Sequence, residues 1–109
     1  MAQTHKVLGQ LYPAITTSGT LYTVPSLTQT ICSTLSVCNT ASGSTSFRVA
    51  IRPTGEAVTS KNYICYDSPI AANDSVLLTL GLSLEATDVV SVYANSGVLA
   101  FSLFGVEIT

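Results

Sequence analysis

The stretch SFRVAIRP, Ser46–Pro53, alternates apolar side chains with polar or small ones at every second position. Successive side chains of a β-strand point to opposite faces, so Phe47, Val49 and Ile51 are expected on one face. Pro53 would end the strand, because proline cannot donate to the hydrogen-bond ladder of a sheet. This stretch therefore predicts a β-strand with one buried face.

Similar segments recur along all 109 residues, and clusters of Gly, Pro, Asn, Asp and Ser separate them. Short strands at such regular spacing are typical of a β-sandwich or a small barrel. The stretch with the most helical residues, Ser83–Asp88, is too short for more than one turn. The predicted strands are Lys6–Tyr12, Thr20–Val24, Thr30–Cys38, Ser46–Arg52, Asn62–Asp67, Ser75–Leu80, Asp88–Ala94 and Val98–Ile108. We expect a single all-β domain over residues 1–109, an antiparallel sandwich of jelly-roll or immunoglobulin-like topology.

Two of the predicted strands, Ser75–Leu80 and Val98–Ile108, carry apolar side chains on both faces. Such strands are buried twice, either by a second layer of the same chain or by another subunit. Strand edges and the outward apolar faces of these two strands are expected to make contacts between subunits. The candidate interface residues are Leu77, Leu99, Phe101, Leu103, Tyr63 and Tyr66.

The composition favours a protein that packs among partners. Charged residues make up only 9% of the chain, against about 25% in ordinary globular proteins. The chain instead contains 14 Ser and 15 Thr. Since free monomers normally use charge to stay apart, we expect assembly, with a soluble Thr-rich β domain as the alternative. The basic residues do not cluster and the net charge is −2, so no nucleic-acid partner is expected.

The segment Met1–Pro13 lacks the basic region, the apolar region and the cleavage site of a secretory signal. No window approaches the run of about 20 apolar residues that a membrane span needs. We therefore expect a protein that is made in a cytoplasm and has no membrane partner.

Two of the three cysteines lie in the predicted strand Thr30–Cys38. Because Cys32 and Cys38 are an even number of residues apart, they are expected on one face, opposite Leu35. They would be about 20 Å apart, whereas a disulfide needs Cα atoms within about 7 Å. Either thiol is a candidate for a disulfide with Cys65 or with another subunit. The alternative is that all three are reduced, apolar packing residues.

No catalytic or metal-binding motif is present. His5 is the single histidine, and no closely spaced cysteine pair accompanies it, which argues against zinc and against a cysteine nucleophile with a histidine base. The carboxylates are scattered, unlike an acid–base pair or a calcium loop. We expect a protein without catalytic residues, cofactor or metal.

The five tyrosines are the remaining candidates for binding, because tyrosine is favoured both at protein interfaces and on surfaces that bind sugars. They are Tyr12, Tyr22, Tyr63, Tyr66 and Tyr93. The chain has no tryptophan, and no cluster of Asn, Asp and Arg near these tyrosines is evident. Interface or core packing is therefore the expected role, and glycan binding is the weaker interpretation.

Three segments carry a resemblance to a known class of proteins. They are LYTVP (Leu21–Pro25) followed by LSVCNT (Leu35–Thr40), the long stretch FRVAIRPTGEAVTSKNYICYDSPIAANDSVLLTLGLSLEATDVVSVYA (Phe47–Ala94), and the tail FSLFGVEIT (Phe101–Thr109). Together they resemble small β-sandwich virion proteins of tailed bacteriophages, which serve as collar, neck, tail-accessory or capsid-decoration subunits.

The resemblance implies many identical copies around the rotational symmetry of a particle, and it implies no catalytic residues. We therefore expect a virion protein, assembled in the host bacterial cytoplasm, that forms a homo-oligomer at the head–tail junction as a collar or neck subunit. Its partners would be its own copies and other neck, tail or capsid proteins. A capsid decoration protein is the alternative, and a receptor- or glycan-binding module of a tail or fibre is a further one.

Overall fold

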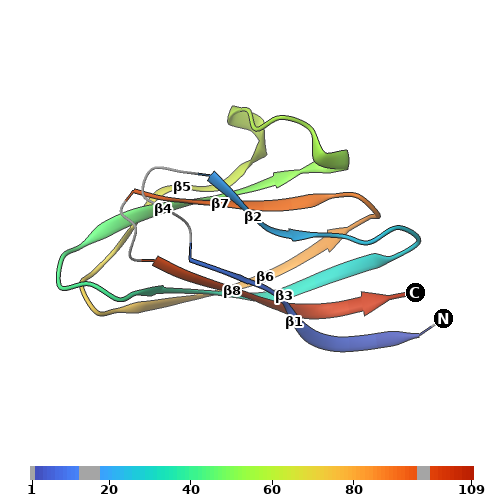
Figure 1. The fold of residues 1–109 in the computed structure, drawn as a ribbon, viewed down its shortest axis with the longest axis horizontal. Coiled ribbons are helices and arrows are strands. Elements are labelled where there is room, and N and C mark those ends of the chain that lie inside the picture. The colour runs from blue at the N-terminus through green and yellow to red at the C-terminus, as the bar shows by residue number, and fades with distance from the viewer. Residues whose placement is uncertain (1, 13–17, 96–98) are drawn as a thin grey trace.

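The computed structural model describes residues 2–12, 18–95 and 99–109 and folds them into two four-stranded antiparallel sheets, packed face to face (Figure 1). All eight predicted strands are found, and the described residues contain no α-helix. The strands are β1 (Gln3–Leu11), β2 (Ser18–Thr23), β3 (Gln29–Asn39), β4 (Thr45–Arg52), β5 (Tyr63–Ile70), β6 (Ser75–Leu84), β7 (Val89–Ala94) and β8 (Leu99–Ile108). Val98, the predicted start of the last strand, lies outside the described residues. The predicted all-β sandwich is confirmed.

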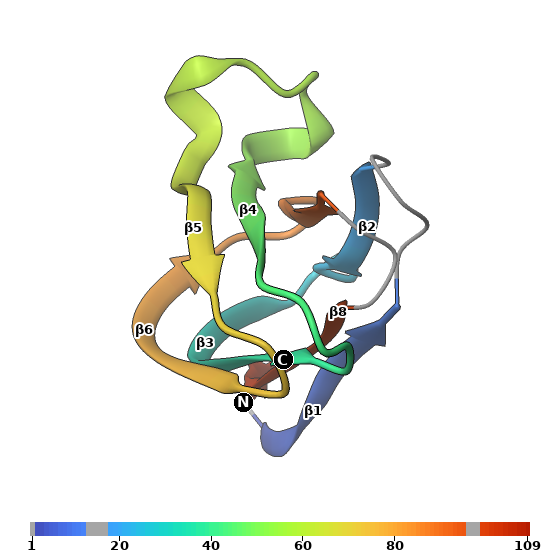
Figure 2. The same ribbon diagram turned by 90° about the vertical axis from the view of Figure 1, so that its left-hand side faces the viewer.

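The strand order distinguishes between the two expected topologies. One sheet, sheet A, has the order β1-β8-β3-β6, and the other, sheet B, has the order β2-β7-β4-β5. The first strand thus pairs with the last, the second with the seventh, the third with the sixth and the fourth with the fifth, as in one long hairpin that has been rolled up. All connections except β4–β5 pass from one sheet to the other (Figure 2). This is the jelly-roll arrangement, in contrast to an immunoglobulin-like fold, where the first two strands pair within one sheet.

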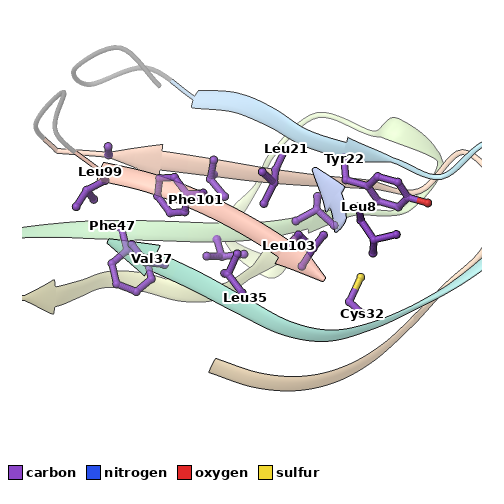
Figure 3. Packing of buried hydrophobic residues seen from close by; sticks show 14 of the residues in the cluster. Leu8, Leu21, Tyr22, Cys32, Leu35, Val37, Phe47, Leu99, Phe101 and Leu103 are labelled. Atoms are coloured by element: carbon purple, nitrogen blue, oxygen red, sulfur yellow. The ribbon is translucent and has the colours of Figure 1, made fainter. Parts of the chain in front are cut away.

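The core lies between the two sheets and is built from the inward side chains of nearly every strand (Figure 3). The alternation expected for β4 holds, because Phe47 and Val49 are buried while Arg48 between them is not. Phe47 of sheet B meets Phe101 of sheet A edge to face, with ring centroids 6.1 Å apart. The two sheets are therefore joined by aromatic as well as aliphatic packing.

Three of the candidate interface residues belong to this core. Leu99, Phe101 and Leu103 have exposed fractions of 0%, 1% and 0%. Their expected role in subunit contacts is wrong, because β8 lies inside sheet A and sheet B covers this face of it. Of the two explanations for an apolar strand, a second layer of the same chain is the correct one here. Leu77 of β6, by contrast, is 68% exposed.

The expected common face of two cysteines is also wrong. The pairing register of β3 shifts between Cys32 and Thr34 against both of its neighbours, β6 and β8. This bulge adds one residue and reverses the alternation, because the side-chain period of a strand is two. Cys32 therefore points into the core with an exposed fraction of 0%, and so does Leu35, whereas Cys38 lies on the outer side.

A polar cluster joins the sheets where β2 meets β8. Tyr22 is 8% exposed, its hydroxyl donates to Glu107 Oε2 at 2.5 Å, and it lies 2.9 Å from the hydroxyl of Thr30. Lys6 Nζ donates to Glu107 Oε1 at 3.1 Å. The hydrogen bond from Tyr22 is the main cause that lowers the pKa of Glu107, and the one from Lys6 adds to it. Together they have a larger effect than burial, which alone would raise this pKa, so the pKa lies below its ordinary value. Burial first, and then the neighbouring carboxylate, raises the pKa of Tyr22, which keeps this donor protonated.

We expect Glu107→Gln to lower the stability at neutral pH by about 1 kcal/mol, because two charge-assisted hydrogen bonds are weakened. A carboxylate whose pKa is lowered by folding stabilises the protein above its unfolded pKa of about 4.3, and this contribution disappears as the pH falls through the lower folded pKa. Urea unfolding between neutral and acidic pH should show the gap between wild type and variant closing below about pH 4.3. A gap that does not change with pH would contradict this, and Glu85→Gln in an exposed turn is the control.

Candidate functional site

The outer face of sheet A is a continuous surface without charged side chains in the described residues. Residues directly opposite each other on antiparallel strands point to the same face, so the register places them in rows across the sheet. Three complete rows, which we call the uncharged face, are Val7, Phe104, Thr34 and Thr79; His5, Val106, Ile31 and Ser83; and Gln10, Ser102, Ser36 and Leu77. None of these is Lys, Arg, Asp or Glu, whereas twelve positions of an ordinary soluble surface carry about three or four.

The uncharged face is large enough for a specific interface. Together with the incomplete rows at its two ends, this surface is about 20 Å wide and about 30 Å long, as judged from strand spacing and rise. The incomplete rows are Gln3, Ile108 and Gln29 at one end and Ala100, Cys38 and Ser75 at the other. The resulting area of about 600 Å² approaches the roughly 800 Å² that each partner buries in a standard interface. Three of its apolar members are unusually exposed, at 46% for Val7, 42% for Ile31 and 68% for Leu77. This surface combines the apolar contact area and the lack of charge found in the centre of interfaces.

The uncharged face ends at β6, which is the least protected of the four edge strands. β6 is ten residues long, and its sequence SVLLTLGLSL contains neither charge nor proline. Its one protective feature is a bulge near Gly81, where the register against β3 shifts. The other edges carry features that discourage further pairing: Lys6 in β1, Pro69 in β5 and a length of only six residues in β2. An exposed, uncharged edge strand offers its backbone groups to another strand, so β6 is the edge best suited to a neighbouring chain.

The structure places the three predicted disulfide residues in different surroundings, all as free thiols. Cys32 lies between the sheets, where burial raises the pKa of its thiol to about 11, and another subunit cannot reach it in the folded domain. Cys65 packs against the core, and burial also raises the pKa of its thiol. Cys38 is half-buried beside the uncharged face. An inter-subunit disulfide through Cys38 or Cys65 stays a prediction, whereas Cys32 is unsuited to one.

The outer face of sheet B has a different character. Here the guanidinium carbon of Arg48 lies 4.3 Å from the ring centroid of Tyr66 and 4.5 Å from that of Tyr93, so that the cation is in contact with both rings. Tyr63 meets Tyr66 edge to face, with centroids 4.9 Å apart. Asp67 completes this group, because it receives hydrogen bonds from Arg48 Nε at 2.7 Å and from Nη2 at 3.4 Å. We call these five residues the aromatic cluster.

A bulge in β5 assembles the aromatic cluster. Phe47 of β4 pairs with Ser68 of β5, and Val49 pairs with Cys65. Between these two pairs, the single residue Arg48 of β4 therefore lies opposite two residues of β5, Tyr66 and Asp67. Asp67 adopts a φ of 49°, a left-handed backbone conformation that accompanies the extra residue. Two consecutive side chains thereby contact the same guanidinium. Its bonds to Asp67, above all, hold the pKa of Arg48 above its ordinary value and keep it charged.

Arg48 and Asp67 lie beside these tyrosines, so the expectation that no cluster of Asn, Asp and Arg lies near them is wrong. Of the predicted binding residues, Tyr63, Tyr66 and Tyr93 come together in the cluster, whereas Tyr22 is buried. The alternation around Arg48 does show that it faces away from the core. The bulge has no comparable local signal, because it depends on the pairing of two strands.

The described ranges, 2–12, 18–95 and 99–109, contain no group of three or more His, Cys, Asp or Glu side chains that could hold a metal ion. No helix in these ranges is long and apolar enough to cross a membrane. Comparison with known proteins finds no family, no curated protein and no solved structure that matches the chain.

Proposed function

We propose that this chain is a non-enzymatic virion protein of a tailed bacteriophage, which oligomerises at the head–tail junction as a collar or neck subunit. The observation that carries the proposal is the uncharged face, which ends at the uncharged, proline-free edge of β6. Covering this face with another protein removes apolar surface from water without desolvating any charge. The segments Leu21–Pro25, Leu35–Thr40, Phe47–Ala94 and Phe101–Thr109 resemble small phage virion proteins, and this resemblance is the reason for proposing a phage particle as the assembly.

The low charge of the whole chain agrees with this function. Subunits of a ring contact their neighbours through two surfaces each, and they dock on further particle proteins as well. A jelly roll offers two broad faces and its strand edges for such contacts. Each such contact covers part of the surface of a ring subunit, which reduces the need for charges that keep a free monomer soluble.

The test is a phage that encodes this chain and carries Leu77→Lys. We expect purified particles to contain about a hundredfold less of this variant than of the wild type, because an ammonium group without a partner would be buried in the contact. Leu27→Lys, in a turn where the side chain is 93% exposed, should be incorporated normally. Quantitative mass spectrometry of the particles measures both variants. Full incorporation of the Leu77 variant would exclude the uncharged face as the contact, and absence of the wild-type chain from the particles would overturn the virion role.

Copy number in the same measurement distinguishes the collar from the capsid lattice. Rotational symmetry at a head–tail junction permits about a dozen copies of a subunit, whereas a capsid decoration protein occupies hundreds of equivalent positions. About a dozen copies would support the collar or neck. Hundreds would replace it with capsid decoration, through the same kind of contact on a different lattice.

A further inference from the structure

An open cleft lies beside the aromatic cluster on the opposite side of the molecule from the uncharged face. It has a volume of about 600 Å³, within the usual range of small-ligand sites. Its lining consists of Tyr63 and Tyr66 of β5 and of Val58, Thr59 and Ser60 in the connection between β4 and β5. In Figure 2 this connection extends beyond the ends of β4 and β5.

The aromatic wall of the cleft is held rigid before any ligand arrives. Tyr66 is 59% exposed, yet its ring is supported by the guanidinium of Arg48 and by the edge contact with Tyr63. Arg48 is in turn held by Asp67 on one strand and by the ring of Tyr93 on another. A ligand that stacks on Tyr66 therefore loses little binding energy to the ordering of this side chain.

The connection that forms the rest of the cleft is also held in place. Asn62 is 5% exposed, and its side-chain amide donates to the carbonyl of Ile51 at 2.9 Å and to Glu56 Oε2 at 3.1 Å. Its side-chain oxygen accepts the backbone N–H of Thr59 at 2.7 Å. Arg52 anchors the same segment, because its guanidinium donates to the carbonyl of Glu56 at 2.7 Å. The cleft is thus formed by the fold itself.

The chemistry of the lining selects the ligand. It offers aromatic rings and hydroxyl groups, and none of its residues is charged. The nearest cations are already neutralised, Arg48 by Asp67 and Lys61 by Glu56 at 3.2 Å. A phosphate or an acidic sugar would therefore find no unpaired cation beside this cleft. A neutral sugar ring suits the lining better, because its C–H groups can pack on the electron-rich face of a tyrosine ring and its hydroxyl groups can bond to the hydroxyls of the lining.

We propose that this cleft binds a neutral saccharide. One sugar ring stacks on Tyr66 against Tyr63, and its hydroxyl groups form hydrogen bonds with the side chains of Thr59 and Ser60. This site would allow the particle to contact a glycan with the face of the subunit that assembly through sheet A leaves open.

The test is a titration of the chain with maltotriose, cellotriose and triacetylchitotriose, followed by two-dimensional amide NMR, with sialyllactose as an acidic comparison. We expect signals of residues 58–66 to shift with at least one neutral trisaccharide, with a Kd of about 1 mM for so open a site. Tyr66→Ala should weaken this binding about tenfold, because it removes the stacking ring. Tyr12→Ala removes a comparably exposed tyrosine, 56%, at the position that follows β1, and should leave the binding unchanged.

The proposal is overturned if none of the neutral trisaccharides shifts these signals, or if only sialyllactose does. It is also overturned if a folded Tyr66→Ala variant binds as tightly as the wild type. Shifts of the same signals with a tyrosine- and proline-rich peptide, in the absence of any effect of saccharides, would assign the cleft to a protein partner instead. The amide spectrum itself shows whether each variant is folded, and Leu77→Lys should bind saccharide normally, which separates this result from the test of assembly.

Discussion

Phe101→Ala is expected to destabilise the domain by about 4 kcal/mol, the largest effect of any single change considered for this protein. Phe101 is 1% exposed and its ring meets Phe47 of the facing sheet, so that truncation leaves a cavity where the sheets are joined. The loss combines the transfer energy of the removed atoms with the cost of the unfilled space. Urea unfolding monitored by circular dichroism measures it.

Leu77→Ala is the matched control, because Leu77 is also an apolar strand residue of sheet A but is 68% exposed. Its stability should change by no more than about 0.5 kcal/mol. A large loss at Leu77 together with a small one at Phe101 would mean that the two faces of sheet A are assigned the wrong way round. The pair thus tests which apolar side chains fold the domain and which remain for assembly.

Gly105→Ala is the second large effect, with an expected loss of about 3 kcal/mol. A Cβ at this position of β8 would lie only 2.2 Å from the carbonyl oxygen of Ile31 and 3.1 Å from the Cα of Cys32. Both atoms belong to the backbone of β3 at its bulge, so they cannot move aside without disturbing the pairing of β3 with β8. The bulge in one strand therefore requires glycine in its neighbour.

Gly43→Ala is the control for this change, because a Cβ at Gly43, in the turn between β3 and β4, would meet no atom within 4 Å. We expect a change between zero and a small stabilisation, since alanine restricts the unfolded chain more than glycine does. Thermal unfolding of the Gly105→Ala and Gly43→Ala variants under the same conditions measures the difference in stability. Equal stabilities would show that the close approach of β3 and β8 at Gly105 is relaxed in solution.

The two broad faces of the sandwich are suited to different kinds of binding partner. Sheet A presents aliphatic, Ser and Thr side chains over a wide area, which favours packing against another protein. Sheet B concentrates aromatic rings and one neutralised ion pair beside a preformed cleft, which favours a small ligand. Assembly through one face leaves the other accessible, so the two proposals are compatible and can fail independently.

Local pattern was sufficient to predict the eight strands and the all-β class. The alternation in Ser46–Arg52 depends only on which side chains can be buried together, and Pro53 ends the strand wherever it lies in the fold. The predicted interface residue Leu77 is exposed, and its role in assembly remains a proposal. The positions of the strands and the all-β class depend on patterns within a few consecutive residues, so they can be predicted without knowing which strand pairs with which.

Pairing between distant strands determined the rest. The choice of jelly-roll order, the burial of Phe101 and the opposite faces of Cys32 and Cys38 all follow from which strand lies beside which and in what register. A single bulge residue reverses every later side chain of a strand, and alternation in sequence carries no mark of it. The aromatic cluster likewise exists because β4, β5 and β7 are neighbours, which brings Arg48 together with rings that are far from it in the chain.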